Sequence, residues 1–310
     1  MIGGESLRRE INYRVIIVQV LVVIFLSINL LLIVTFFSKD FFYTTMRYIL
    51  FSITLLSDCL FLLITNILLI LSYFRINIQM WLCLITYIFL SLYTFVTPVT
   101  LTVMTLERCV AICMPLRHGE LCSTRNSLHC VLIIYSLSSV PCIVVLSSFF
   151  ASATHIFYTQ GRICSVEIFI IHKWQGHLRS AINQFYFLLM IIVIVFSYVK
   201  IMNVAKAASG RKKNVTWKGL RTVILHAFQL LLCLISLWCP LIEAAVLQIN
   251  LKLFIDVRYF NYITFILAPR CLSPLIYGLR DERFFHALKY YALCAGTRFL
   301  RQDTRLEHQF

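Results

Sequence analysis

The sequence predicts an all-α membrane protein in which seven helices form a bundle and a short amphipathic helix follows the last span. The chain of 310 residues is 60% apolar and only 13% charged, so a water-soluble core cannot hide its apolar surface. Its apolar residues form continuous runs of about 20 residues, the length of a helix that crosses a bilayer. Because the runs do not alternate with polar residues, a closed β-barrel is disfavoured.

Seven apolar runs follow one another without internal repetition. The expected spans are 15–37, 48–72, 80–112, 128–149, 180–204, 220–247 and 259–279. The third and sixth runs are long, as tilted helices would be. The connecting segments are short except for residues 150–179 and the basic residues 205–219.

The basic residues predict the orientation of the bundle. Lys and Arg are densest from Lys200 to Arg221 and in the C-terminal region, and the positive-inside rule assigns these segments to the cytoplasm. Residues 1–14 then form an extracellular N-terminus, 15–280 the membrane domain, and 281–310 a cytoplasmic amphipathic helix and tail. We expect a multi-pass plasma-membrane protein without a removable signal peptide.

The net charge of +15 has the same explanation. The basic residues lie between apolar runs, so membrane lipid is an expected partner and nucleic acid is not. A transporter would need internal repeats and broken helices, which are not evident. The eight His residues are scattered, with His226 alone inside a span, so neither an enzyme, a metal site nor a cofactor is expected.

The C-terminal segment 281–294 is predicted to be an amphipathic helix on the inner leaflet. Phe284 and Leu288 are apolar positions set against Arg283. Cys294 at its end is a candidate for palmitoylation, and an unmodified thiol is the alternative.

Several polar residues and one proline interrupt the apolar runs. Glu107 and Arg108 end the third run, where an ionised pair is costly and therefore functional by default. Asp58 lies in the middle of the second run and needs a partner for the same reason. Pro240 removes a backbone hydrogen bond in the sixth run and predicts a kink.

These positions resemble the motifs of rhodopsin-like, class A G-protein-coupled receptors over nearly the whole chain. The matching residues are Asn29, Asp58, Glu107-Arg108-Cys109, Tyr198, Trp238-Cys239-Pro240 and Ser273-Pro274-Leu275-Ile276-Tyr277. Residues 104–118 and 269–281 are similar to odorant receptors, the latter to a divergent, fish-type 131-like group. Cys109 and Ser273 depart from the family, which usually has Tyr and Asn there.

The resemblance implies a receptor that binds a small-molecule odorant outside and activates a heterotrimeric G protein, of the olfactory stimulatory type, inside. A class A receptor for a lipid or a peptide is the alternative. Residues implied in activation and coupling are Glu107, Arg108, Tyr198, Trp238, Pro240, Pro274 and Tyr277. Arg108 beside Glu107 would act as a two-state latch, with a snorkelling Arg as the alternative. Pro240 and Trp238 would form a hinge, or else a static kink.

In the family the carboxylate at the place of Asp58 binds a sodium ion. Arg270 lies one helical turn before Pro274, and we expect its guanidinium to pair with Asp58 in place of the ion. The alternative is that Arg270 points towards ligand or water. The resemblance also implies a disulfide between Cys83 and Cys164, with two free thiols as the alternative.

A mostly apolar ligand pocket is expected in the outer halves of the helices. The lining is projected to comprise Leu90, Ser91, Thr94, Phe95, Asn183, Tyr186, Leu241, Ile242, Glu243, Ala245, Tyr259, Ile263 and Leu267. Each of these side chains has packing within the bundle as its alternative role. Glu243 has two alternatives, a ligand contact or an ion pair with Arg258.

Overall fold

The computed structural model describes residues 2–37, 45–154, 163–208, 224–225 and 227–272. Its elements are α1 (Ile2–Phe37), α3 (Met46–Tyr73), α4 (Met80–Cys113), α5 (Pro115–Leu121), α6 (Thr124–Ser152), the 3-10 helix η1 (Val166–Phe169), α8 (Lys173–Ala208), α10 (Cys239–Leu247), α11 (Leu251–Asn261) and the π-helix η2 (Tyr262–Leu267). Within these described ranges, six helical segments are long and apolar enough to cross a membrane. The seventh comprises α11, η2 and the helical residues 268–272, beyond which the described part ends.

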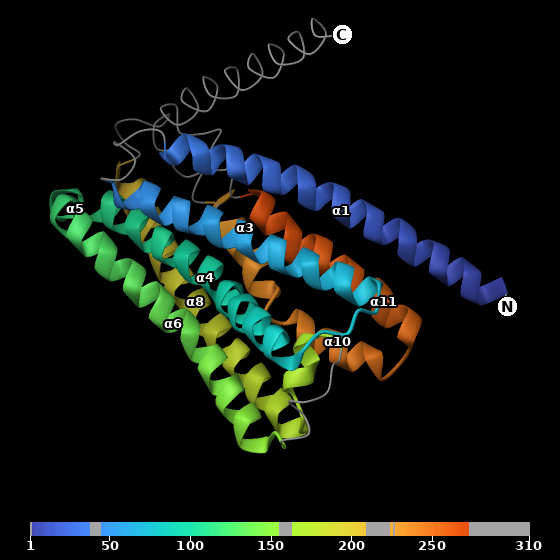
Figure 1. The fold of residues 1–310 in the computed structure, drawn as a ribbon. Helices are drawn as coiled ribbons and strands as arrows, with labels where there is room; N and C mark the ends of the chain where they lie inside the picture. Colours follow the sequence, from blue (N-terminus) through green and yellow to red (C-terminus); the bar gives the residue numbers. More distant parts are fainter. Residues whose placement is uncertain (1, 38–44, 155–162, 209–223, 226, 273–310) are drawn as a thin grey trace, which may run out of the picture.

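Helix α4 is the centre of the bundle. It packs against α3, α6 and α8, while α1 packs against α3 and α10 against α11. Figure 1 shows α1 and α3 running side by side, with α6 and α8 on the other side of α4. The side chains that α4 contributes therefore reach most of the other helices.

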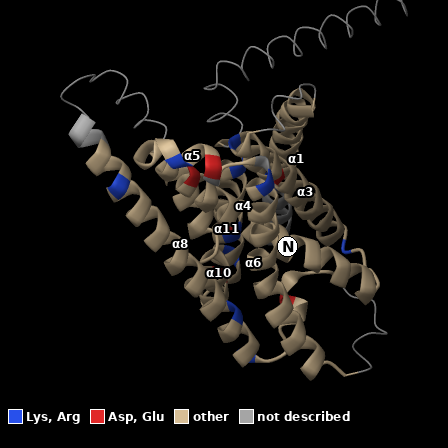
Figure 2. Cartoon of the chain, turned by 90° about the vertical axis from the view of Figure 1, so that its left-hand side faces the viewer, with Lys and Arg blue, Asp and Glu red and all other residues tan. Residues whose placement is uncertain are grey.

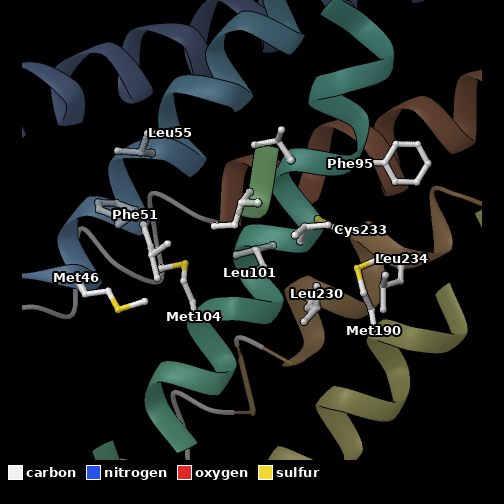
Figure 3. Close-up of a cluster of buried hydrophobic side chains, with 14 of the residues drawn as sticks. Met46, Phe51, Leu55, Phe95, Leu101, Met104, Met190, Leu230, Cys233 and Leu234 are labelled. Carbon is white, nitrogen blue, oxygen red and sulfur yellow. The ribbon is translucent and has the colours of Figure 1, made fainter. Parts of the chain in front are cut away.

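A cluster of buried apolar side chains joins these helices (Figure 3). Leu101 and Met104 from α4 meet Leu55 from α3, Met190 from α8 and Leu230 from the sixth span. All five are at most 3% exposed. Because lipid tails are as apolar as these side chains, close packing rather than burial from water favours their association.

The outer faces of the long helices are apolar as well. Ile16, Leu30, Leu132, Phe185 and Ile192 are each more than half exposed. In Figure 2 the long helices are mostly without charged residues, and several of the charges gather around α5 at one end. This distribution fits a protein whose lateral surface is covered by lipid.

Three helices begin much earlier than their apolar runs predicted. α1 begins at Ile2 instead of residue 15, α8 at Lys173 instead of 180, and the seventh helix at Leu251 instead of 259. Asn250 caps that seventh helix, since its side chain accepts a hydrogen bond from the backbone N–H of Lys252 at 2.8 Å. Hydropathy marks only the part of a helix inside hydrocarbon, whereas the backbone hydrogen bonding continues until a cap or breaker ends it.

The extra turns of α1 contact other elements at the end of the bundle assigned to the outside. Asn12 accepts a hydrogen bond from the Tyr73 hydroxyl at 2.6 Å, and Arg14 pairs with Asp256 at 2.6 Å. The helical start of α1 differs from the expected N-terminal segment, and the boundaries of the three predicted regions stay predictions. The amphipathic helix 281–294 lies outside the described residues.

Candidate functional site

The outer end of α4, as the charge distribution assigns it, is linked to the long loop before α8. Cys83 and Cys164 form a disulfide with a Cα–Cα distance of 5.5 Å, which confirms the predicted bond. Both cysteines are buried and pack with Tyr87, Phe149 and Phe169. The rings of Tyr87 and Phe169 lie 4.3 Å apart, so η1 is held against the outer ends of α4 and α6.

The expected pocket residues of α4 and α8 contact one another. The rings of Phe95 and Tyr186 lie 5.0 Å apart, and the Tyr186 hydroxyl donates to the Leu137 carbonyl at 2.6 Å. Leu90 is buried, and its carbonyl accepts a hydrogen bond from Thr94 at 2.7 Å. The hydroxyls of Tyr186 and Thr94 are thus already hydrogen-bonded within the bundle. Ser91 is half-buried in the turn between Leu90 and Thr94.

The expected pocket residues of α10 have two different environments. Leu241, Ile242 and Ala245 are exposed. Glu243 is half-buried, accepts a hydrogen bond from Asn261 at 3.1 Å and lies 3.9 Å from Arg258. Its carboxylate therefore links α10 to α11.

The same arginine extends this network to the outer loop. Arg258 lies 3.7 Å from Glu167 in η1, so one guanidinium contacts carboxylates from two other elements. Both members of this second pair are more than half exposed, which makes it a weak contact by itself. It nevertheless places the loop that carries Cys164 close to the seventh helix.

The expected pocket residues of the seventh helix lie largely towards α1 and α3. Leu267 is 1% exposed and packs with Val18, Val22 and Leu62. Tyr259 packs at the edge of the same cluster. Ile263 is half-buried within η2. This face of the seventh helix therefore contributes to helix packing.

The sixth helix is interrupted where Pro240 follows. Residues 236–238 form a turn between the helical residues 227–235 and α10. In an unbroken helix, the Leu237 carbonyl would accept a hydrogen bond from the Leu241 N–H. This N–H bonds to the Trp238 carbonyl at 3.0 Å. The Leu237 carbonyl instead receives a hydrogen bond from the Asn183 side-chain amide at 3.1 Å. The Trp238 ring meets Phe187 edge-on at 5.7 Å.

The middle of the bundle holds a buried charged pair. Arg270 Nε lies 3.4 Å from Asp58 Oδ1, and the two side chains are 5% and 0% exposed. Thr97 donates to the same carboxylate oxygen at 2.8 Å. The Arg270 guanidinium also lies 3.7 Å from the centre of the Phe61 ring and donates to the Ile266 carbonyl at 2.6 Å. The structure thus brings together the two residues that the sequence suggested as partners.

At the end of α4 that the charge distribution assigns to the inside, Glu107 has a partner that the sequence did not reveal. Its carboxylate lies 3.0 Å from His118 Nε2 in α5. Arg108 is half-buried. Tyr198 of α8 packs beside Cys109 and Cys113, which lie one turn apart on α4. Pro274 and Tyr277 lie outside the described residues.

Sequence reasoning missed three residues that contact the charged centres, and a fourth that lies beside one of them. Three of them surround the buried pair: Thr97 and Phe61 contact it directly, and Gln229 donates to the Pro269 carbonyl at 3.2 Å, next to Arg270. Gln229 had a readable signal, because an amide within an apolar span needs a partner. His118 had none, since its distance from Glu107 depends on how α5 folds back.

The environment of Cys122 completes the description of this inner end. Cys122 ends α5, and its backbone N–H donates to the His118 carbonyl at 2.9 Å. Burial and the neighbouring Glu107 carboxylate raise the pKa of the Cys122 thiol above its ordinary value. The side chains of His118 and Cys122 thus both lie near the Glu107 carboxylate in the last turns of α4.

Comparison with known proteins relates the chain to a receptor family and to a zebrafish receptor. The family described as 7 transmembrane receptor (rhodopsin family) matches residues 28–277. Odorant receptor 131-2 of Danio rerio is 40% identical to the chain over 294 residues, which are 94% of this chain and 90% of that receptor. Both matches agree with the family that the sequence motifs indicated.

Proposed function

The chain belongs to the rhodopsin family of seven-transmembrane receptors, and we propose that it is an odorant receptor coupled to a stimulatory, olfactory-type G protein. As a member of this family, the chain has a multi-pass helical membrane domain. Its resemblance to odorant receptors rests on the similarity to the zebrafish receptor. It is a receptor and not an enzyme. The observation that carries the proposal is that similarity, which extends over 94% of the chain.

The proposed ligand is a small, mostly apolar molecule that binds in the outer half of the bundle. The lining side chains would come from Leu90, Ser91 and Phe95 in α4 and from Leu241 and Ile242 in α10, whose apolar character suits such a ligand. Glu243 offers a polar anchor, although Asn261 and Arg258 compete for its carboxylate. The ion pair with Arg258 and a ligand contact both remain compatible with this arrangement.

The proposed orientation places the Cys83–Cys164 disulfide outside and Arg108 inside. The density of Lys and Arg on the inner connections supports it. An epitope tag at the N-terminus should be accessible on intact cells, and a tag at the C-terminus only after permeabilisation. Both tags accessible on the same face would contradict the topology.

The proposed signal transmission connects two of the described contacts with the turn in the sixth helix. Ligand in the outer half would shift the packing around Trp238 and Phe187. The turn at residues 236–238 is a break about which the inner part of the sixth helix can move, as expected for a hinge next to proline. At the inner end, Glu107 would exchange its contact with His118 for one with Arg108, or the reverse, and this exchange would change the state of the latch. The G protein would bind beside Arg108 and Tyr198.

The test is a chemically broad odorant panel on cells that co-express the receptor and an olfactory-type G protein, with cyclic AMP as the readout. Delivery to the cell surface is measured on the same cells through an N-terminal tag. We expect dose-dependent cyclic AMP for a subset of odorants. A delivered receptor that responds to none of them, but responds to lipids or peptides, would support the alternative class of ligand.

A further inference from the structure

Three potential metal ligands meet where α5 folds back against the end of α4. A Glu107 carboxylate oxygen, a His118 imidazole nitrogen and the Cys122 sulfur all lie within 4.8 Å of one another. Among the residues that the structure describes, no other group of three or more His, Cys, Asp or Glu side chains has ligand atoms this close together. Glu107 is not a loosely hydrated surface acid, because its side chain is only 9% exposed.

Local sequence determines this geometry. Pro115 starts α5, a position that its fixed φ angle favours. His118 and Cys122 are then separated by one helical turn, and the hydrogen bond from the Cys122 N–H to the His118 carbonyl closes that turn. Both side chains consequently lie on one face of α5, and the 3.0 Å contact shows that this face meets Glu107.

The chemistry of the three ligands selects the class of metal ion. Imidazole, thiolate and carboxylate together suit zinc, whereas magnesium and calcium prefer all-oxygen sites. With zinc–ligand bonds of about 2.0–2.3 Å, ligand atoms in a tetrahedral site lie roughly 3.3–3.7 Å apart. The observed spacing reaches 4.8 Å at most, so small side-chain rotations are sufficient.

We propose that Glu107, His118 and Cys122 form a binding site for a zinc-class divalent ion that ties α5 to the inner end of α4. Three protein ligands leave a fourth position for water. The bound ion would replace the direct contact between Glu107 and His118, which otherwise joins the two helices.

The site has a consequence for signalling that rests on the proposed function. Glu107 is also the acid next to Arg108, so a bound ion would keep this carboxylate from pairing with the arginine. The experiment below is independent of signalling, and its failure would leave the proposed receptor function untouched.

The experiment is a cobalt titration of the purified full-length receptor in lipid nanodiscs. Cobalt replaces zinc in such sites and gives visible bands in tetrahedral coordination and a near-ultraviolet thiolate-to-cobalt band. We expect both sets of bands for the unmodified protein, with zinc displacing the cobalt. Cys122→Ser should lose the near-ultraviolet band, and His118→Ala should weaken binding at least about tenfold.

The matched control is Cys113→Ser, which removes a half-buried thiol at the same end of α4. Cys113 lies 3.9 Å from Cys109, so this pair of thiols is a competing set of ligands on α4. The control should keep the full spectrum. Loss of the thiolate band in Cys113→Ser, its survival in Cys122→Ser, or the absence of tetrahedral bands on folded protein would each overturn the proposal. A cooperative thermal unfolding transition establishes that each variant is folded.

Discussion

The side-chain amide of Asn183 donates a hydrogen bond of 3.1 Å to the backbone carbonyl of Leu237. Because the helix is broken before Pro240, this carbonyl does not receive the usual bond from Leu241, whose N–H bonds to Trp238. A residue of α8 thereby compensates for the break in the sixth helix. The contact suggests that α8 holds the hinge in one arrangement.

Replacing Asn183 with Leu should lower the stability of the receptor and allow the two parts of the sixth helix to move more freely about the break. The change keeps the size of the side chain but leaves the buried Leu237 carbonyl without its donor, at a cost of about 1–3 kcal/mol. We expect a lower Tm of the purified receptor and higher agonist-independent cyclic AMP. Gln184→Leu, at the exposed neighbouring position, is the control. Unchanged Tm and basal signal would show that the hydrogen bond is dispensable.

Breaking the Asp58–Arg270 pair should be far more harmful than removing both charges. Asp58→Asn or Arg270→Gln alone leaves one buried charge without its opposite, which costs about 3–5 kcal/mol. We expect both single variants to lose Tm and surface delivery, and the double variant to recover most of the loss. A double variant as unstable as the sum of the two singles would mean that the side chains do not interact.

Agonist affinity should not depend on sodium. The guanidinium of Arg270 lies 3.4 Å from Asp58 and neutralises the carboxylate that would otherwise attract a sodium ion. Replacing sodium chloride with an organic chloride salt at constant ionic strength should leave the binding curve of an agonist from the odorant panel unchanged. A sodium-dependent shift in the unmodified receptor would contradict this use of Arg270.

Arg108→Ala should abolish ligand-evoked cyclic AMP while surface delivery is kept. The change removes the charge next to Glu107 at the inner end of α4, and Arg108→Lys should restore part of the response. Surface labelling of the N-terminal tag separates loss of signalling from loss of protein. Normal signalling by Arg108→Ala would exclude the latch and favour a snorkelling surface residue.

Loss of the disulfide should destabilise the outer end of the bundle. The bond joins residues 81 positions apart and so restricts the unfolded chain, by about 2–4 kcal/mol in soluble proteins. Cys83→Ser, Cys164→Ser and the double variant should lower Tm and ligand response equally. Cys130→Ser, a free cysteine in α6, should behave as the unmodified protein. Additive effects of the two single changes would indicate separate roles.

The sequence by itself determined the membrane class, the family and the polar positions within the helices. These conclusions depend on local properties: run length, charge between runs, and motifs such as Glu107-Arg108 and Trp238-Cys239-Pro240. The disulfide could be inferred for the same reason, since its two cysteines match family positions. The outer ends of α1, α8 and the seventh helix could not, because helical hydrogen bonding continues beyond the apolar part.

Only the tertiary structure decided which further partners the charged groups have. Glu107 pairs with His118 because α5 turns back after Pro115. Thr97 joins the Asp58–Arg270 pair because α3, α4 and the seventh helix converge at one depth. Such contacts depend on how separate helices rotate and pack against one another, and no spacing along the chain records that geometry.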